Sequence, residues 1–409
     1  MLRFIKKKFI NELKKTRSRL KLNFLISLTN FLSGSKKKFA TKNVRYLDLA
    51  VLTRKKIFPE LKVRTYFPNY TVTENNAYIE VISPEVELVE FKDHTISGSC
   101  SGFINGKYLF IERYCNEDNE NANYNSGSVL SHNNSFSLII ESEITTVDSG
   151  FFLIGNGSWN YYHWVIEILP KLQVYLELGL YKENVKLLVS DSVSGNENFK
   201  FLLESMLGEI KVDIIFVSST FNLKVNHMYH LTPINNLLFN EREIGLANNI
   251  LHLRYESLSF VTSRILRTIT LNNNDFFCAD RIFLARKMCG VREYNQNDII
   301  PLLLKYDFKI IYMEDHKIEQ QILLFKNAKY IVGASGAAWT NLIFCNSSCR
   351  ALTWLPESVK NFPAFSTLAK FAGASLFFFT TESNHYKDLH DKYFIDLAFF
   401  ERKLIELLE

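Results

Sequence analysis

Long apolar runs, paired cysteines and the common nucleotide-binding fingerprints are all missing from this sequence. No stretch of its 409 residues reaches 18 consecutive apolar residues, so no segment is expected to cross a bilayer as a helix. The 6 cysteines form no CxxC pair, and the closest two, Cys345 and Cys349, have no neighbouring histidine to complete a zinc set. We therefore expect reduced, structural thiols. No GxGxxG fingerprint follows any expected strand, so a Rossmann dehydrogenase fits poorly.

The composition is that of an ordinary globular protein, with 47% hydrophobic and 14% aromatic residues. At roughly 100–200 residues per domain, the length predicts two or three domains. Disorder, collagen-like repeats and a disulfide-stapled mini-fold are excluded.

Charge is distributed unevenly along the chain. Residues 1–45 contain 14 lysines and arginines and one acid, Glu12, which gives them a net charge of +13 and leaves the rest at −8. Apolar residues recur at helical spacing between these cations, namely Phe4, Ile5, Phe9, Leu13, Leu20, Phe24, Leu25, Leu28, Phe31 and Leu32. This basic amphipathic helix predicts an anionic membrane surface as its partner. The alternatives are a solvated arm or a helix packed on the body; nucleic acid is disfavoured, because the aromatics lie on the apolar stripe.

The basic segment does not resemble a secretory signal. Polar residues interrupt the stretch 20–32, and no small-residue cleavage site follows it. We therefore expect a cytoplasmic protein that lies peripherally on the inner face of the plasma membrane.

The pattern of strands and helices changes near residue 155. From about 46 to 140, short strands alternate with turn residues, which predicts an antiparallel or mixed β region. Beyond it, apolar strands alternate with helices, as in a parallel sheet covered on both faces. The expected helices are 160–178, 198–207, 241–257, 296–306, 318–326, 337–344 and 395–408, and the expected strands are 186–190, 212–217, 281–285, 309–312, 330–332 and 351–355. The fold class is α/β, with two Rossmann-like halves.

This pattern predicts four parts. Residues 1–45 form the basic segment, and 46–270 form a domain with a β-rich start and a Rossmann-like half. A polar linker at 272–275 leads into a second Rossmann-like domain, 271–390, and the helix in 391–409 packs across the junction or on a core. Open parallel sheets bind ligands at the carboxyl ends of their strands, so two such halves predict a working cleft between them.

The first unusual segment is a glycine-containing turn that leads into an aromatic-rich helix. His163 and Glu167 lie four residues apart in this helix, on one face. A carboxylate that contacts an imidazole can orient it and raise its basicity for general-base work. The alternative is a histidine that is satisfied within an aromatic core, beside a surface glutamate.

The second segment is a buried strand that ends at Arg286, with Arg292 and Asn295 downstream. A doubly wound half binds phosphates at this end of its strands, and the planar guanidinium contacts phosphate oxygens bidentately. The alternative is that these arginines are surface residues.

The third segment, residues 330–341, is a strand, a loop of small residues and a helix start. Such a turn lets backbone N–H groups and the positive end of a helix approach an anion closely. The alternative is that small residues serve tight packing. The loop is not a Walker A loop, because no lysine follows it.

In this order, the three segments resemble glycosyltransferase family 61. The resemblance lies in NYYHWVIEILPKL, in RIFLAR with its downstream arginine and asparagine, and in EQQILLFKNAKYIVGASGAAWTNLIF, and it covers about residues 155–356. It implies a GT-B fold, in which two Rossmann-like domains face a cleft, and inverting transfer from a nucleotide-sugar. It also implies that no metal is needed, and no DxD pair of carboxylates occurs in the sequence.

The resemblance also implies roles for individual residues. His163 and Glu167, in the acceptor-side domain 46–270, become the candidates for deprotonating the acceptor, and which of them is the base stays open. Arg286 and Arg292 would clasp the diphosphate. The donor-binding residues in 271–390 are Arg286, Arg292, Asn295, Glu314, Gln321, Gly333, Ser335, Gly336, Thr340 and Asn341.

Two positions depart from the family pattern. Many relatives carry histidine at Ser335, an ionisable group in the donor loop, so the donor preference is not carried over from them. Many also carry glutamate at Gln296, a departure that is tolerable because Asn295 remains. The expected protein is a hexosyl-, N-acetylhexosaminyl- or pentosyltransferase that adds a sugar to a lipid-linked or oligosaccharide acceptor of a growing bacterial capsule, lipopolysaccharide or exopolysaccharide, without a cofactor. The alternative is a catalytically inactive module that binds nucleotides or glycans in an assembly complex.

Overall fold

A computed structural model describes residues 37–45, 53–71, 77–106, 108–111, 128–132, 137–237, 251–271, 278–287, 292–381 and 392–409. The chain divides into two compact units, each discontinuous in sequence. Unit 1 comprises Met1–Leu61, Pro84–Ile234 and Leu238–Glu243, and unit 2 comprises Lys62–Ser83, Asn235–Leu237 and Ile244–Glu409. This division differs from the boundary expected at residue 270, because both a β-hairpin from early in the chain and the helix before residue 271 belong to unit 2.

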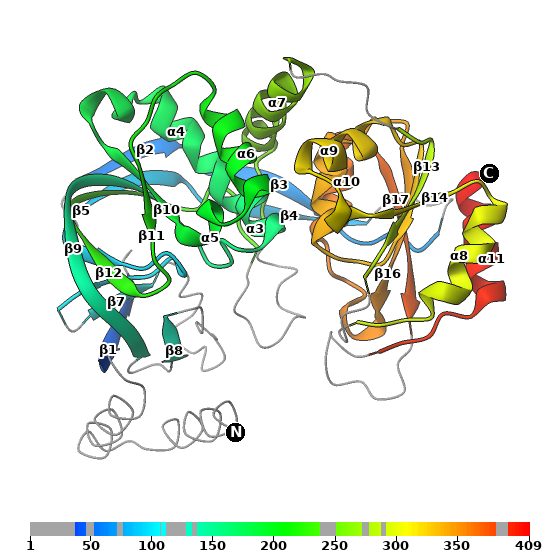
Figure 1. Cartoon of the computed structure of the whole chain (residues 1–409), viewed down its shortest axis with the longest axis horizontal. Helices are drawn as coiled ribbons and strands as arrows, with labels where there is room; N and C mark the ends of the chain where they lie inside the picture. The colour runs from blue at the N-terminus through cyan, green and yellow to red at the C-terminus, as the bar shows by residue number, and fades with distance from the viewer. Residues whose placement is uncertain are drawn as a thin grey trace. The chain divides into compact units, whose positions relative to one another are not determined.

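In the part of unit 1 that is described, ten strands form one mixed sheet (Figure 1). The strands are β1 (Lys37–Arg45), β2 (Thr53–Phe58), β5 (Val86–Ile96), β6 (Phe103–Asn105), β7 (Tyr108–Ile111), β8 (Val129–His132), β9 (Ser137–Leu153), β10 (Lys186–Ser190), β11 (Ile214–Val217) and β12 (Phe221–Leu231). They follow the order β1-β7-β6-β5-β12-β9-β10-β11, with β2 on β5 and β8 on β9. The last four strands of this order are mutually parallel, whereas β5 runs antiparallel to β12. A Rossmann-like set of parallel strands is thus joined to an antiparallel β region.

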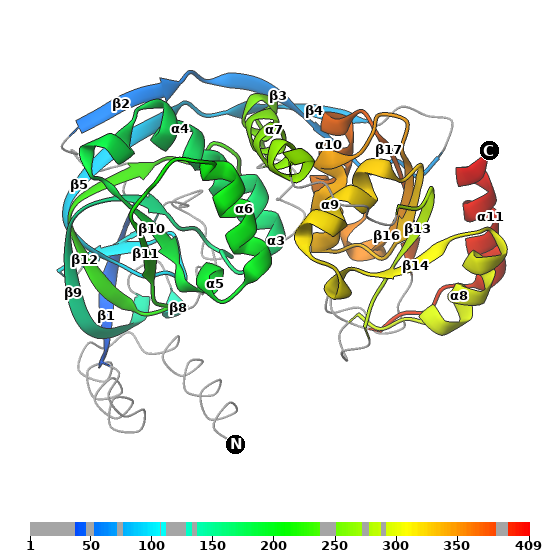
Figure 2. The same cartoon turned by 45° about the horizontal axis from the view of Figure 1, so that its top comes forward.

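The helices of unit 1 connect the parallel strands. They are α3 (Tyr161–His163), η2 (Trp164–Ile168), η3 (Leu169–Lys171), α4 (Leu172–Glu177), η4 (Leu180–Glu183), α5 (Asp191–Ser194) and α6 (Glu197–Leu207). In both views α3, α5 and α6 lie on the same side of β10 and β11 (Figures 1 and 2). The core of the sheet contains Phe91, Phe103, Phe152, Leu188 and Met228, all almost fully buried.

Unit 2 is built on a five-stranded sheet that is parallel throughout, in the order β14-β13-β15-β16-β17. The strands are β13 (Arg281–Ala285), β14 (Lys309–Tyr312), β15 (Tyr330–Gly333), β16 (Arg350–Pro356) and β17 (Ser375–Thr381). The helices are α7 (Tyr255–Leu271), α8 (Gln296–Lys305), η6 (Met313–Asp315), α9 (Ile318–Asn327), η7 (Ala337–Phe344), η8 (Glu357–Val359), α10 (Ala364–Ala372) and α11 (Leu397–Leu408). In chain order the strands lie 2-1-3-4-5, as in doubly wound sheets. The order reverses between β13 and β15, where such a sheet leaves a crevice for a ligand.

A hairpin from early in the chain belongs to unit 2. It consists of β3 (Leu61–Tyr66) and β4 (Tyr78–Ser83), which form a two-stranded sheet. Within unit 2, the hydroxyl of Thr65 donates to the carbonyl of Leu251 (2.7 Å). The segment after β3 also pairs with β17, because the N–H of Phe378 donates to the carbonyl of Asn69 (2.8 Å). The hairpin is therefore part of the hydrogen-bonded framework of unit 2.

The end of β4 is held by a buried arginine. Nε of Arg254 donates to the hydroxyl of Ser83 (2.8 Å), which also lies 3.1 Å from Nδ1 of His252. The side chain of Asn235 accepts from the N–H of Arg254 (2.7 Å) and donates to Ser257 (2.9 Å). Three separate parts of the sequence thus meet in one buried polar network of unit 2.

The C-terminal helix α11 packs on the core of unit 2, in agreement with one of the two expectations for it. Phe400, Leu404 and Leu407 are buried in the same cluster as Leu352 and Trp354 of β16. The helix has one apolar face, and the sheet of its own unit covers that face.

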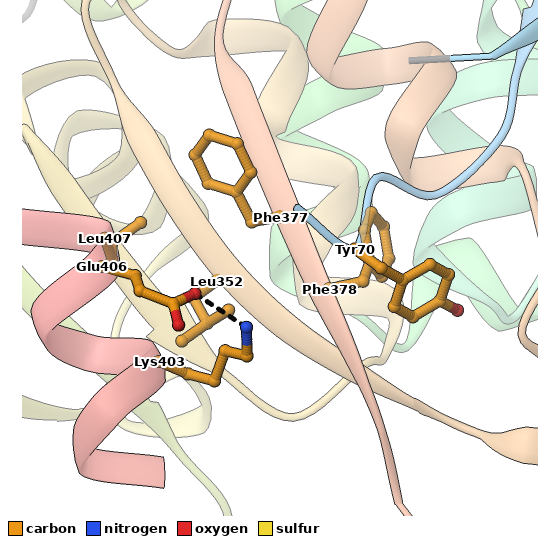
Figure 3. A pocket seen from close by; sticks show the side chains of 7 residues that line it. All are labelled: Tyr70, Leu352, Phe377, Phe378, Lys403, Glu406 and Leu407. Carbon is orange, nitrogen blue, oxygen red and sulfur yellow. Dashed lines mark hydrogen bonds and ion pairs between the residues drawn. The ribbon is translucent and has the colours of Figure 1, made fainter. Parts of the chain in front are cut away.

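A small hollow lies between this helix and the sheet (Figure 3). Its lining consists of Tyr70, Leu352, Phe377, Phe378, Lys403, Glu406 and Leu407. Lys403 and Glu406 form an ion pair at 2.7 Å on the helix side. Since the charges on this side neutralise each other and the rest of the lining is largely apolar, the hollow belongs to the packing of α11 on unit 2.

Two other expectations differ from the structure. The basic segment was expected to extend to residue 45, but Lys37–Arg45 form β1, which pairs with β7 and β9; residues 1–36 lie outside the described residues. The helix expected at 241–257 is wrong over residues 251–254. These residues are not helical, His252 forms a β-bridge with Asn236, and α7 begins at Tyr255. The expected linker at 272–275 lies outside the described residues.

Candidate functional site

The helical stretch that carries His163 is irregular at the position of interest. Asn160 caps it by accepting a hydrogen bond from the N–H of Tyr162 (2.9 Å), and α3 then passes directly into the π-helix η2. All five residues of η2 are buried. Single π-turns inside helices are frequent at functional sites, because they re-aim side chains that a regular helix would place elsewhere.

His163 and Glu167 are in direct contact. Nδ1 of His163 lies 2.6 Å from Oε2 of Glu167, and both residues are only 4% exposed. When the carboxylate is ionised, it accepts a hydrogen bond from Nδ1–H and so fixes the tautomer in which Nε2 carries the lone pair. The expectation that this spacing brings the two side chains together is confirmed, and the glutamate is buried, not at the surface.

A glycine shapes the space for the imidazole ring. Gly157 has φ +73°, and a Cβ at this position would lie 2.8 Å from Cδ2 of His163. The turn before α3 therefore requires glycine at position 157 for two independent reasons. The backbone there is left-handed, and the His163 ring leaves no room for a Cβ.

Replacing Gly157 with alanine tests this arrangement. We expect the left-handed backbone to cost about 1–2 kcal/mol of folding free energy and the added methyl group to displace the His163 ring. Gly179→Ala is the matched control, because it has φ +67° but its nearest side-chain atom, Cδ of Lys182, lies at 3.6 Å. Urea unfolding should show a loss for both variants. Nitrogen NMR of the His163 ring should change for Gly157→Ala alone, and an equal change in both would refute the steric explanation.

Three other histidines of unit 1 lie in different settings. Burial lowers the pKa of His94 to about 4, and burial and the charge of Lys171 lower the pKa of His230 well below its usual value. Both rings pack among the phenylalanines of the sheet core. His227 pairs with Glu90 at 2.8 Å, and both side chains are about one third exposed. Neither setting is that of His163, which is a buried imidazole held by a buried carboxylate.

In unit 2, Arg286 lies at the carboxyl end of β13, where the strand order reverses. Its guanidinium donates from Nη2 to the carbonyl of Ser335, in the loop after β15. Gln296 holds the backbone of Arg286 from both sides, since its Oε1 accepts from the arginine N–H (2.7 Å) and its Nε2 donates to the carbonyl (2.9 Å). The hydroxyl of Tyr294 also donates to this Oε1 (2.9 Å). The position of Arg286 is therefore fixed by three hydrogen-bonding groups.

The loop after β15 fits closely around this arginine. A Cβ on Gly336 would lie 2.7 Å from Nη2 of Arg286, and a Cβ on Gly333 would lie 2.7 Å from Cβ of Leu284. The indole of Trp339 donates to the carbonyl of Ala334 (3.0 Å) and closes the loop. Helix η7 begins at Ala337 without a side-chain cap, so its first N–H groups and a guanidinium lie at one loop. This arrangement is suited to an anion.

The structure also brings Arg292 towards this region. Burial raises the pKa of Tyr393, and its hydrogen bond with Trp354 and the charges of Arg286 and Arg292 lower it in part, so both guanidinium groups act electrostatically on this phenol. Arg292 has φ +53°, in the left-handed region. Two of the expected phosphate-binding cations thus lie within electrostatic range of the same phenol.

The remaining predicted residues fall into two groups. Asn295 bonds both backbone groups of Ile395 (3.0 and 2.9 Å), and Gln321 donates to the carbonyls of Met313 and His316 (2.9 Å each), so both amides shape loops. Glu314 is exposed in the short helix after β14. Thr340 and Asn341 are fully buried beneath the loop. Of the predicted donor residues, the structure gathers Arg286, Ser335 and Gly336 most tightly. Gln296, which the sequence indicated only as a departure from the family pattern, supports Arg286.

No group of three or more histidine, cysteine, aspartate or glutamate side chains in the described residues could hold a metal ion. Cys100, Cys278, Cys345 and Cys349 have free thiols. Within the described ranges, no helix combines the length and the hydropathy needed to cross a membrane.

Comparison with known families agrees with this geometry. The family model described as Glycosyltransferase 61 matches residues 161–352, just under half of the chain. The match begins at the helix that carries His163 and ends within β16, so it includes the histidine–glutamate pair as well as the Arg286 loop. No curated protein matches the chain. Residues 161–352 are therefore a glycosyltransferase family 61 domain.

Proposed function

We propose that this protein is an inverting glycosyltransferase that transfers a hexosyl, N-acetylhexosaminyl or pentosyl group from a nucleotide-sugar to a hydroxyl of a growing bacterial surface glycan. The observation that carries the proposal is the Arg286 guanidinium held against the loop at the uncapped start of η7, at the reversal point of a 2-1-3-4-5 sheet. The family match supports the reaction class.

In this proposal the donor diphosphate lies at the loop after β15. Arg286 and Arg292 neutralise its charge, and the first N–H groups of η7 bind its oxygens. As the bond between the anomeric carbon and the diphosphate breaks, negative charge grows on the leaving oxygen, and fixed positive groups stabilise that charge. Two guanidinium groups supply the charge that Mg²⁺ supplies elsewhere, so we propose that transfer needs no metal.

His163 is the proposed general base. Glu167 holds Nδ1, and Nε2 takes the proton from the acceptor hydroxyl. The acceptor oxygen then attacks the anomeric carbon from the side opposite the leaving group, the new glycosidic bond forms, and the nucleoside diphosphate departs with the bonding electrons. One displacement inverts the anomeric configuration.

The basic segment gives the proposed location. A segment with a net charge of +13 would hold the enzyme at an anionic inner membrane face, close to a lipid-linked acceptor of capsule, lipopolysaccharide or exopolysaccharide synthesis. The competing proposal is an inactive nucleotide- or glycan-binding module, which the same anion site would equally suit.

A panel of nucleotide-sugars tests both proposals. We expect one donor to bind selectively and to be hydrolysed slowly in EDTA, with release of the nucleoside diphosphate. Selective binding without turnover, with or without acceptor, would favour the binding module. A folded protein that binds no nucleotide-sugar would refute the transferase proposal.

A further inference from the structure

We propose that Trp159 is the platform on which a sugar ring of the acceptor stacks, an inference that rests on the proposed transferase function. Trp159 is 62% exposed, whereas Trp164 and Trp339 are fully buried and Trp354 is 2% exposed. A large, rigid aromatic surface left in water is unusual for tryptophan, and exposed tryptophans are enriched where proteins bind ligands and partners. Within the described residues, no ring or cation contact covers the indole.

The backbone that carries Trp159 is held firmly. The hydroxyl of Ser158 donates to the carbonyl of Gly155 (2.7 Å) and accepts from its N–H (3.1 Å), and the N–H of Asn160 donates to the carbonyl of Gly157 (2.7 Å). Asn156 accepts from the N–H of Ser101 (3.1 Å), which ties the turn to the sheet side of unit 1. A preorganised position lowers the entropy that a binding residue loses when its ligand arrives.

The same turn contacts His163. The Cβ position of Gly157 lies 2.8 Å from the imidazole, and the Cα of Trp159 lies at most about 7.6 Å from that of Gly157, since consecutive Cα atoms are about 3.8 Å apart. Asn160, the next residue, caps the helix that begins with α3. Trp159 is therefore only two residues from the position that contacts the proposed base.

The chemistry of the indole selects a carbohydrate. One face of a pyranose presents several polarised C–H groups, which pack on the electron-rich face of an indole while the hydroxyls at the ring edge stay hydrated. Stacking of this kind orients a ring without contacting its reactive hydroxyl. The general base can then reach that hydroxyl.

Kinetics with Trp159→Ala and Trp159→Phe test the inference, with methyl glycosides of the common hexoses, N-acetylhexosamines and pentoses as acceptors. By analogy with base–aromatic stacking, we expect the alanine variant to raise the acceptor KM about 5- to 150-fold, and phenylalanine to recover most of the loss. Donor hydrolysis without acceptor should not change. Phe394→Ala, which removes a 65% exposed ring from unit 2, is the control and should leave both reactions unchanged.

Quenching of tryptophan fluorescence by iodide gives a second readout, because the other three tryptophans are buried. A methyl glycoside that serves as acceptor should protect wild-type fluorescence, and Trp159→Ala should lack this protected fraction. Any one of three results would overturn the inference. They are protection by the nucleotide in place of the glycoside, an unchanged acceptor KM in the alanine variant, and no protection by any glycoside. Normal donor hydrolysis alongside any of these results would leave the transferase proposal intact.

Discussion

His163→Asn is expected to lower the rate of sugar transfer about 10²- to 10⁴-fold while the affinity for the nucleotide-sugar stays unchanged. A positioned general base contributes an effect of this size, and asparagine keeps hydrogen-bonding groups near Glu167 but cannot accept the proton. The measurement is acceptor-dependent release of nucleoside diphosphate, combined with calorimetric binding of the donor. Loss of rate at constant donor affinity separates a catalytic role from a folding defect.

The matched control is a second histidine–glutamate pair in the same unit. His227 contacts Glu90 at 2.8 Å on the sheet surface, so His227→Asn removes a similar contact away from the proposed site. We expect this variant to transfer sugar at the wild-type rate. Glu167→Gln decides which member of the buried pair is the base, because it should reduce the rate less than His163→Asn if the glutamate only orients the ring. A larger loss in Glu167→Gln would assign the base to the glutamate.

Arg286→Ala is expected to weaken binding of the nucleotide-sugar about 10²- to 10³-fold. Gln296 and Ser335 hold Arg286 at the loop, so alanine removes a cation that the proposed function places against the diphosphate. Lysine at this position should restore part of the affinity, because it keeps the charge but not the planar fork. Titration calorimetry with the preferred donor measures both effects.

The control for this prediction lies on the same strand. Arg281 begins β13 at the opposite end, donates to the carbonyl of Tyr306 (2.8 Å) and stacks on Tyr330. Arg281→Lys should leave donor affinity unchanged and affect only stability. If Arg281→Lys and Arg286→Lys weakened binding equally, the anion site would not lie at the carboxyl end of this strand.

The elements that could be predicted from the sequence are those with continuous apolar runs and clear polar ends. The expected strands 186–190, 281–285 and 309–312 coincide with β10, β13 and β14, because buried parallel strands carry this pattern. The same periodicity gave no sign of β12, α10 or β17. Strand β12 alternates between polar and apolar residues and is held by pairing with β5, more than a hundred residues earlier, which local pattern does not contain.

The candidate site shows the same division. The family resemblance assigns Arg286 and the loop at Ser335 to one donor site, and their hydrogen bond shows that the two are in contact. Many relatives carry histidine where this chain has Ser335. This difference has little effect on the contact with Arg286, because the residue at 335 accepts through its backbone carbonyl. The π-helix could not be predicted, since three residues of α3 lead into it without any break in composition. Burial of Thr340 and Asn341 was also missed, because the sequence does not reveal which face of the short helix η7 is turned to the core.

The buried network around Arg254 has a consequence for biosynthesis. Its partner Ser83 lies 171 residues earlier in the chain, so the hairpin β3–β4 leaves the ribosome long before the rest of unit 2 exists. At about 5–20 residues per second, roughly ten to thirty seconds pass between the synthesis of Ser83 and that of Arg254, and the sheet of unit 2 is made only after that. During that time the hairpin has no sheet to join, and a nascent chain that stalls in between would expose it. A C-terminal fragment made without the hairpin would bury an arginine whose hydroxyl partner is missing, so unit 2 cannot be obtained by a single cut of the gene.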